Sequence, residues 1–376
     1  MTSAVHVLIP GDLEIRTGGY GYDRRIIAGL RNLGWRVDVR RLDDSFPTPT
    51  PAARAHAAKV LADIPDGAVV LVDGLALGAL PAEVGHEAGR LKIVALVHHP
   101  LAEETGIDTA LAAELRISET HALAAVRAVV VTSRTTAVKL REYGVTADRI
   151  TVVEPGTDPA PLARGSIIAN APSALSPEPS ALSPKLLALS PEPADVALLC
   201  VATLTPRKGY ELLMSALAAT PARNWHLTCA GSLERDDQTV SRVRAQVRDN
   251  GFEDRVSFVG DLDAAAVAVQ YDRADVFVLP TLYEGYGMVV AEALARGLPI
   301  VSTATGAIRD LVGTDAGIVV APGDLPAFTE ALSRVLGDAD LRARLAAGAR
   351  ETRQRLPTWD QSAASMARVL EAAARA

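Results

Sequence analysis

Aromatic residues and cysteine are scarce in this chain of 376 residues, which has 4% aromatic side chains and two cysteines. So few cysteines exclude a small scaffold held together by disulfides. The 49% of hydrophobic residues exclude a chain that is disordered throughout. Positive charge is not in excess either, because 45 Asp and Glu outnumber 38 Lys and Arg. We therefore expect no nucleic acid partner.

Long apolar runs are also missing. No stretch approaches the ~18 consecutive apolar residues that cross a bilayer, and the N-terminus lacks the charged region of a signal peptide. Cys200 and Cys229 each lie in an apolar run, which predicts two thiols in strand cores rather than a disulfide or a metal site. We expect a cytoplasmic protein that neither spans a membrane nor is secreted through a signal peptide.

Short runs rich in Val, Ile and Leu alternate with longer stretches of helical periodicity. Runs that are apolar on both faces are typical of buried parallel strands covered by helices. The rhythm occurs twice, so the sequence predicts an α/β protein with two doubly wound Rossmann-like domains. The predicted strands are 5–9, 37–39, 68–72, 93–97, 128–131 and 150–153 in the first half, and 197–201, 225–229, 256–259, 276–279, 300–302 and 318–320 in the second.

An Ala-Leu-Ser-Pro unit occurs three times between the two halves, at 174–177, 181–184 and 188–191. A proline in each unit removes a backbone donor and disrupts a helix, so this seven-residue repeat favours an extended linker over a coiled coil. We assign residues 1–159 to an N-terminal domain, 160–194 to a flexible linker rich in Pro, Ser and Ala, 195–357 to a C-terminal domain and 358–376 to a C-terminal helix.

Two groups of residues at predicted strand ends are candidates for ligand binding in the first half. Gly18, Gly19 and Gly21 open a helix whose first amides could hold an anion, although a turn that simply needs glycine explains them too. His98 and His99 follow the fourth predicted strand, where α/β sheets place ligands. Neighbouring residues in an extended chain point to opposite sides, so at most one of them faces a given cleft. A structural polar residue is the alternative.

In the second half, Arg207 and Lys208 follow a predicted strand at the start of a helix. Two cations at a helix N-terminus suit a diphosphate, with solvated surface charges as the alternative.

The segment 279–293 is the most informative, because a strand ends there, glycines follow and a helix contains Glu292. Glu284 precedes Glu292 by eight residues, up to about 10 Å along a helix, which is too far to share one proton. The spacing suits two acceptors that hold opposite ends of one elongated polyol, such as a sugar and a ribose. Ordinary surface glutamates are the alternative.

With these motifs, the chain resembles the retaining GT-B glycosyltransferases of the family 4 type (glycosyl transferases group 1), and the resemblance spans both halves. The matching residues are Gly18-Gly19, Thr132-Ser133, the segment 153–158, Pro206-Arg207-Lys208-Gly209, Val259-Gly260, and Glu284 with Glu292. The resemblance implies two domains that face each other across a cleft, with the acceptor on the N-terminal side and the nucleotide sugar on the C-terminal side. It also implies that the helix with Trp359 crosses back to the N-terminal domain.

The family's residue roles are carried over by resemblance alone. His98, with His99 as the alternative, matches the active-site histidine, and many members have an arginine where this chain has Thr203, so that Arg207 would take its place. The expected roles are the ribose for Glu292, sugar hydroxyls for Glu284, phosphate for Lys208 and Arg207, the base for the loop with Asp261 and Leu262, and donor contacts for Gly18, Gly19, Thr203, Gly285, Tyr286 and the amides of Gly287, Met288 and Val289.

The resemblance implies a transferase that moves a sugar from a nucleotide sugar to an acceptor hydroxyl with retention of configuration. Asp261 and Asp263 could be mistaken for an Asp-x-Asp metal site, but GT-B enzymes neutralise the diphosphate with cations and helix dipoles. We expect no metal and no cofactor, since the nucleotide sugar is a co-substrate. The alternatives are a nucleotide-sugar epimerase, a sugar phosphorylase and a non-catalytic two-domain binding protein.

The donor base, the sugar and the acceptor stay open at this point. The acceptor could be a sugar, a glycoside, a small molecule or a lipid-linked molecule. A basic start of the first domain could contact an anionic membrane surface, but an ordinary solvated face is the favoured reading. Its residues are Arg24, Arg25, Arg31, Arg36, Arg40 and Arg41.

Overall fold

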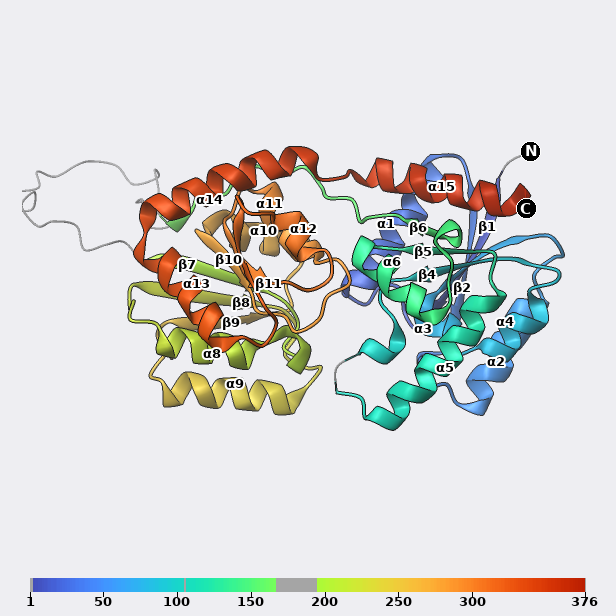
Figure 1. Cartoon of the computed structure of the whole chain (residues 1–376), viewed down its shortest axis with the longest axis horizontal. Coiled ribbons are helices and arrows are strands. Elements are labelled where there is room, and N and C mark those ends of the chain that lie inside the picture. The colour runs from blue at the N-terminus through green and yellow to red at the C-terminus, as the bar shows by residue number, and fades with distance from the viewer. Residues whose placement is uncertain (1–2, 105, 167–194, 376) are drawn as a thin grey trace, which may run out of the picture.

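The computed structural model describes residues 3–104, 106–166 and 195–375. It contains two six-stranded parallel sheets with flanking helices (Figure 1). The first sheet has the strand order β2-β1-β3-β4-β5-β6 and the second has the order β12-β11-β10-β7-β8-β9. Each apolar run predicted from the sequence coincides with one strand, so the prediction of two doubly wound domains is confirmed.

The first sheet comprises β1 (Ala4–Pro10), β2 (Arg36–Leu42), β3 (Val69–Asp73), β4 (Lys92–Val97), β5 (Ala128–Val131) and β6 (Ile150–Val152). Its helices are α1 (Gly18–Asn32), α2 (Pro51–Ala62), α3 (Gly74–Leu77), α4 (Pro81–Glu87), η1 (Leu101–Glu103), α5 (Thr109–Ala125), α6 (Arg134–Leu140), η2 (Arg141–Tyr143) and η3 (Ala147–Arg149). The edge strand β2 is longer than the predicted run because it continues through Arg40 and Arg41, whose charged side chains an apolar pattern does not register.

The second sheet comprises β7 (Val196–Val201), β8 (Trp225–Ala230), β9 (Val256–Gly260), β10 (Val276–Leu279), β11 (Ile300–Thr303) and β12 (Gly317–Val320). Its helices are η5 (Pro206–Lys208), α8 (Tyr210–Ala219), α9 (Asp237–Asp249), α10 (Ala264–Arg273), α11 (Met288–Ala295), α12 (Ile308–Val312), α13 (Leu325–Gly337), α14 (Ala339–Thr352) and η6 (Arg353–Arg355), and α15 (Trp359–Arg375) follows.

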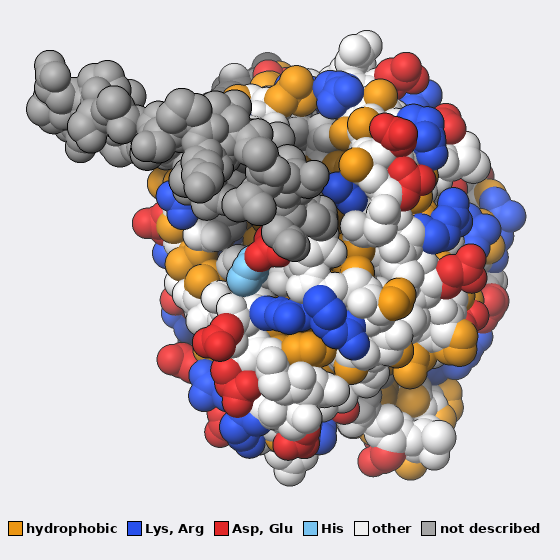
Figure 2. Space-filling view, turned by 90° about the vertical axis from the view of Figure 1, so that its left-hand side faces the viewer, with side chains coloured by type: hydrophobic (Ala, Val, Ile, Leu, Met, Phe, Trp, Pro, Cys, Tyr) orange, Lys and Arg blue, Asp and Glu red, His pale blue; other side chains and the backbone are white. Residues whose placement is uncertain are grey.

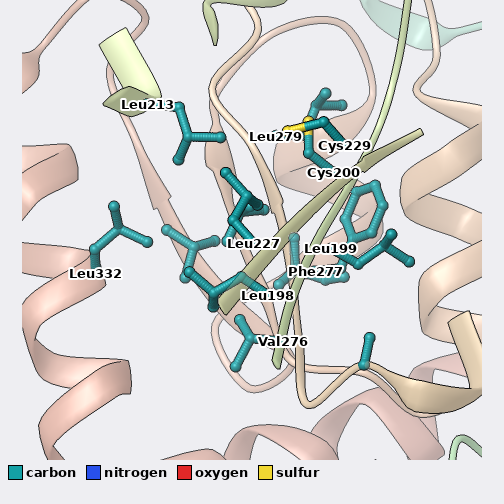
Figure 3. Packing of buried hydrophobic residues seen from close by; sticks show 14 of the residues in the cluster. Leu198, Leu199, Cys200, Leu213, Leu227, Cys229, Val276, Phe277, Leu279 and Leu332 are labelled. Carbon is teal, nitrogen blue, oxygen red and sulfur yellow. The ribbon is translucent and has the colours of Figure 1, made fainter. Parts of the chain in front are cut away.

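The core of the second domain packs both faces of its sheet, and Figure 3 shows part of it. Cys200 on β7 and Cys229 on β8 are paired in register, buried and free of disulfides. Burial raises the pKa of the Cys200 thiol to about 12. These cysteines are core residues, as the sequence predicts.

The last helix, α15, packs on the first domain (Figure 1). One face of the first sheet is covered by α2, α4, α5 and α6, and the other by α1 and α15. Met366 and Leu370 of α15 are fully buried there, together with Ile26 and Leu30 of α1. The C-terminal helix therefore completes the core of the N-terminal domain.

The segment from residue 160 to 166 lies along the second domain. The Ala163 amide donates to the Arg296 carbonyl at 2.9 Å, Arg164 is ion-paired with Asp272, and the Ser166 amide donates to Asp275 at 3.0 Å. These residues, which the sequence assigns to the linker, are held by polar contacts. The rest of that segment, with the Ala-Leu-Ser-Pro repeat, lies outside the described residues.

Side chains of both charge signs are interspersed on the face of the molecule shown in Figure 2. Among the described residues, no helix is long and apolar enough to cross a membrane.

The contact between α1 and α15 provides a test of how α15 is held. A Cβ at Gly29 would overlap the Ala363 side chain, whereas a Cβ at Gly85 in α4 would meet nothing within 4 Å. We expect Gly85→Ala to raise stability by about 0.5–1 kcal/mol through helix propensity. Gly29→Ala should lower it by about 1–3 kcal/mol, because overpacking outweighs propensity.

Urea unfolding of both variants measures the contrast. Adding Ala363→Gly to Gly29→Ala should recover most of the loss, because it removes the atom that Gly29→Ala overlaps. Equal stabilisation by Gly29→Ala and Gly85→Ala would mean that α15 does not pack closely on α1.

Candidate active site in the cleft between the two domains

Each sheet has a point at which the chain reverses its direction of growth. After β2 the first sheet continues on the other side of β1, with β3, and after β9 the second sheet continues on the other side of β7, with β10. Ligands of open α/β sheets bind beyond the carboxyl ends of the strands at such points. Gly18 and Gly19 follow β1, Arg207 and Lys208 follow β7, and Glu284 follows β10. The sequence-predicted residues therefore lie where this topology forms crevices.

The two domains approach each other closely at this place. A Cβ at Gly285 would lie 2.5 Å from the His98 carbonyl oxygen, so only glycine fits against the end of β4. The Thr135 hydroxyl donates a 2.7 Å hydrogen bond to the Gly306 carbonyl across the same boundary. The loop after β10 is thus packed against the N-terminal domain.

Lys208 and Glu284 form an ion pair through Lys208 Nζ and Glu284 Oε1. Their side chains are 15% and 11% exposed. Burial alone would raise the pKa of Glu284, but the positive charges of Lys208 and Arg207 outweigh it and hold this pKa below its usual value. The structure thus brings two of the predicted site residues together, each neutralising the other.

Backbone contacts fix this pair in place. The Arg207 carbonyl accepts hydrogen bonds from the Leu282 amide at 2.7 Å and from the Thr281 hydroxyl at 3.1 Å. Gly209 has a φ of +70°, and a Cβ there would overlap the Pro280 carbonyl. The loops after β7 and β10 therefore form one unit that presents Lys208 and Glu284 to the cleft.

Arg207 links that unit to the first domain. Its guanidinium donates to the Tyr283 carbonyl at 3.3 Å and lies 3.5 Å from Glu104 of the N-terminal half. Its side chain is 25% exposed. Arg207 and Lys208 place two positive charges beside the start of α11.

The helix α11 begins after Gly287, whose φ is +96°. No described side chain caps this helix, so the Met288 and Val289 amides have no intrahelical partner and are available to an anion. The Tyr286 side chain is buried beside Ala291 and Ala307, which leaves only its backbone to contact a donor. The expected contact of Tyr286 is in this way restricted to main-chain atoms.

Glu292 lies within α11 and accepts a 3.0 Å hydrogen bond from the Tyr271 hydroxyl. That hydroxyl also lies 3.1 Å from the Val289 carbonyl. Burial raises the pKa of Glu292 above its usual value. Glu284 and Glu292 have separate partners, in agreement with their spacing, which excludes a shared proton.

Other predicted donor residues lie beside this cluster. Thr203 follows β7, and its carbonyl accepts a 2.9 Å hydrogen bond from the Thr205 amide. Asp261 follows β9 with Leu262 and lies 3.4 Å from Arg16 of the opposite domain. Asp261 lines a pocket of about 400 Å³ with Glu14, Ile15, Arg16, Ser232, Glu234 and Arg235. This pocket spans the mouth of the cleft between the two domains.

Asp263 has a structural task, because its carboxylate caps α10 by accepting the Ala266 amide at 2.8 Å. In the part of the chain that the structure describes, Asp261 and Asp263 belong to no group of three or more His, Cys, Asp or Glu side chains that could surround an ion.

His98 and His99 point to different surroundings. A Cβ at Gly19 would lie 3.4 Å from the His98 ring, so the first turn of α1 packs on that imidazole. His99 lies 3.2 Å from Glu104, and its ring lies 5.6 Å from the Tyr283 ring of the other domain. His98 thus belongs to the Gly18-Gly19 side of the cleft, and His99 to the Arg207 side.

Two buried aspartates beside His98 were missed by the sequence reasoning. His98 Nε2 lies 3.2 Å from Asp23 Oδ1 and 3.6 Å from Asp73 Oδ2, and both aspartate side chains are 1% exposed. Asp73 ends β3 at the reversal point of the sheet, and Asp23 lies one helical turn after Gly19 on the same face of α1. The argument that singles out His98 at a strand end applies equally to Asp73.

Asp23, Asp73 and His98 are the one group in the described residues whose ligand atoms lie close enough to surround a metal ion. A separation of 3.2 Å between Nε2 and Oδ1 is also that of a hydrogen bond, so a proton suffices to join them.

The comparisons with known proteins agree with this architecture. The family model for Glycosyltransferase Family 4 matches residues 39–161, and the model for Glycosyl transferases group 1 matches residues 195–338. The sucrose-phosphate synthase from Thermosynechococcus elongatus superimposes with a TM-score of 0.78 at 22% identity, covering 98% of each chain. The Anabaena protein HepE, solved in complex with UDP and glucose, superimposes with a TM-score of 0.74 at 16% identity, covering 98% of this chain and 100% of that one.

Two doubly wound domains with this cleft define the GT-B architecture. With a matching domain in each half, the chain belongs to the GT-B glycosyltransferases of the family 4 and group 1 type. It is 34% identical to the D-inositol 3-phosphate glycosyltransferase of Xylanimonas cellulosilytica over 66% of this chain and 58% of the relative. It is 32% identical to the lipopolysaccharide core biosynthesis mannosyltransferase LpsB of Rhizobium meliloti over 42% and 45%. The chain thus spans about half the length of these relatives.

The ion pair between Lys208 and Glu284 makes a prediction for the donor-free protein. We expect Lys208→Ala to cost about 3–5 kcal/mol, because it leaves a buried carboxylate without its partner. The double variant Lys208→Met/Glu284→Gln should lie closer to wild type, since it leaves no unpaired charge. Urea unfolding of the two single variants and the double variant gives the coupling energy.

The pair of Lys139 with Glu103, at 3.1 Å and with side chains 33% and 28% exposed, is the matched control. Lys139→Ala should cost less than about 1 kcal/mol. An equally small loss for Lys208→Ala would show that Glu284 is solvated and does not need Lys208.

Proposed function

We propose that this protein transfers a sugar from a nucleotide-sugar donor to an acceptor hydroxyl with retention of anomeric configuration and without a metal. The observation that carries the proposal is the unit of Lys208, Glu284 and the start of α11 at the reversal point of the C-terminal sheet. It combines cations and free amides for a diphosphate with a carboxylate for sugar hydroxyls. Family membership supports it.

The donor would lie with its diphosphate between Lys208, Arg207 and the first amides of α11. Charge develops on the leaving diphosphate as the glycosidic bond breaks, and fixed cations and dipoles stabilise that charge without having to reorganise. The side chain of Glu284 would hold hydroxyls of the donor sugar. Lys208 would then exchange part of its interaction with Glu284 for the phosphate oxygens.

The nucleoside would extend from the diphosphate toward Glu292, whose carboxylate suits the ribose hydroxyls. Asp261 and Leu262 would border the base at the pocket by the cleft mouth. The Anabaena protein HepE was solved with UDP and with UDP-glucose, and we propose a nucleoside diphosphate sugar as the donor here too. The N-terminal side, with His98, would receive the acceptor.

In the retaining reaction that we propose, the departing diphosphate oxygen takes the proton of the acceptor hydroxyl on the face where the new bond forms. No strongly basic side chain is then required. The other donor-side residues orient the two substrates, because a misplaced reacting atom costs rate even where binding persists.

A division of labour between the two glutamates tests the donor geometry. We expect Glu292→Ala to weaken the binding of a nucleoside diphosphate by about 1.5–3 kcal/mol, since the ribose loses a charged acceptor. Glu284→Ala should leave that ligand within about threefold of its wild-type affinity and should lower turnover instead. Calorimetry with UDP, GDP and ADP measures the first effect and identifies the base.

Glu330→Ala, which alters an exposed glutamate on α13, is the control and should change neither quantity. Equal weakening by Glu284→Ala and Glu292→Ala would contradict these separate roles. No binding of any nucleoside diphosphate, together with no turnover, would contradict the proposed function itself.

Retention and metal independence have a direct test. Turnover should persist in EDTA, and proton NMR of the first product formed should show the anomeric configuration of the donor. Complete loss of activity in EDTA that a divalent metal restores, or an inverted product, would overturn that part of the proposal.

A further inference from the structure

The side chain of His98 has one ring nitrogen held and one ring nitrogen free. Nε2 faces Asp23 and Asp73, whereas no described residue bonds to Nδ1, and the side chain is 20% exposed. The free nitrogen accepts a hydrogen bond in neutral imidazole and donates one in imidazolium. The chemistry that His98 offers therefore depends on the charge that its neighbours favour.

We propose that Asp23 and Asp73 are positioning residues that hold His98 as an imidazolium, so that its free Nδ1–H donates to an oxygen atom of a substrate in the cleft. The inference deepens the proposed function, on which its kinetic part rests. It assigns His98 the recognition of a hydroxyl or phosphate oxygen rather than the removal of a proton from the acceptor.

The first support is geometric. Asp23 and Asp73 come from α1 and from the end of β3, and their carboxylates converge on one nitrogen. The ring is held between Gly19 and the edge of Tyr22, whose ring centroid lies 5.4 Å away. Asp73 is itself fixed, because its Oδ1 accepts the Leu75 amide at 2.8 Å. The imidazole orientation is thus set by packing as well as by hydrogen bonds.

The second support is a buried polar atom without a partner. Asp23 Oδ2 has no hydrogen-bond donor in the described structure, although Asp23 is 2% exposed. A buried carboxylate without compensation is costly, and a positive charge on the adjacent ring lowers that cost. Two carboxylates around one nitrogen therefore favour a charged ring over a neutral one.

The balance of charges agrees in direction. Burial alone would lower the pKa of His98, but the charge and hydrogen bond of Asp23, followed by the charge of Asp73, raise it above its usual value. Burial and the charge of Asp23 raise the pKa of Asp73 to about 7. The pair of Asp23 and His98 therefore remains charged near neutral pH, while Asp73 can share a proton.

The other titratable groups around this cluster do not reverse that balance. Tyr20 of α1 lies close by, and burial together with Asp73 and Asp23 raises its pKa to about 12, so it stays neutral. Burial likewise keeps Tyr22 neutral by raising its pKa. Across the cleft, the loop at Gly285 contacts the His98 carbonyl, and its charged residue Glu284 is paired with Lys208.

Imidazole NMR of the full-length protein tests the charge state without any substrate. In a two-bond proton–nitrogen spectrum, the His98 signals, assigned by their loss in His98→Gln, should titrate above the ordinary midpoint of about 6.5. Asp23→Asn should lower that midpoint by about one pH unit or more. Asp73→Asn, which keeps a carbonyl oxygen for the Leu75 amide, should lower it less and serves if Asp23→Asn does not fold.

The pair of His6 with Asp38, 3.0 Å apart in the same domain, is the matched control. Asp38→Asn should leave the His98 midpoint unchanged. A His98 midpoint that is the same in wild type and in both aspartate variants would overturn the proposal. Addition of Zn²⁺ or Mn²⁺ that raises the wild-type melting temperature and perturbs the His98 signals would also overturn it, in favour of a metal site.

The kinetic counterpart is a pH profile. Because the charged form exists below the raised pKa and is lost as pH rises through it, kcat/KM should fall on the alkaline side. Asp23→Asn should shift this fall to lower pH, with at least a tenfold loss at pH 8 and a small loss at pH 6. An unshifted profile in a variant whose NMR midpoint has moved would overturn the role in catalysis but not the charge state, and absence of turnover in wild type would count against the proposed function alone.

Discussion

The architecture depends on one burial problem in the N-terminal domain. A parallel sheet needs cover on both faces, and four helices cover one face of the first sheet, but the N-terminal half supplies only α1 for the other. The C-terminal helix α15 fills that place with Met366 and Leu370. Because α15 follows directly from the second domain, the hydrophobic core of one domain ties it to the other. The cleft therefore lies between two bodies joined by a buried helix as well as by the segment between them.

Close backbone approaches give this cleft its geometry. Gly285 meets the His98 carbonyl, Gly209 meets the Pro280 carbonyl, and a Cβ at Gly306 would overlap carbonyls of the loop that contains Glu284. Each contact brings a strand-end loop within van der Waals distance of another backbone. The charged side chains are consequently held by main-chain packing, and their positions do not rely on the flexible stems of lysine and arginine.

Much of this was accessible from the sequence, because parallel strands and strand-end loops leave strong patterns. Runs such as 276–279 mark buried strands, and Glu284 with Glu292 stands out in a loop bounded by glycines. Asp23 was not recognisable, because an acidic residue within a helix looks solvated until the sheet places it beneath His98. Nor could the sequence show that Lys208 and Glu284 pair with each other, since that contact joins loops 76 residues apart. Long-range pairing of charges depends on the strand order, which a pattern along the chain does not specify.

The position of α15 has a consequence for biosynthesis. The strands and the first helix of the N-terminal domain leave the ribosome long before α15 does, because the whole second domain is translated between them. At about 5–20 residues per second, the uncovered face of the first sheet stays exposed for on the order of ten seconds or more. During that time its Val and Leu side chains form an apolar surface that a chaperone could bind. Maturation of the first domain is thus coupled to completion of the second, and a nascent chain arrested within the second domain carries an N-terminal domain whose core is still open.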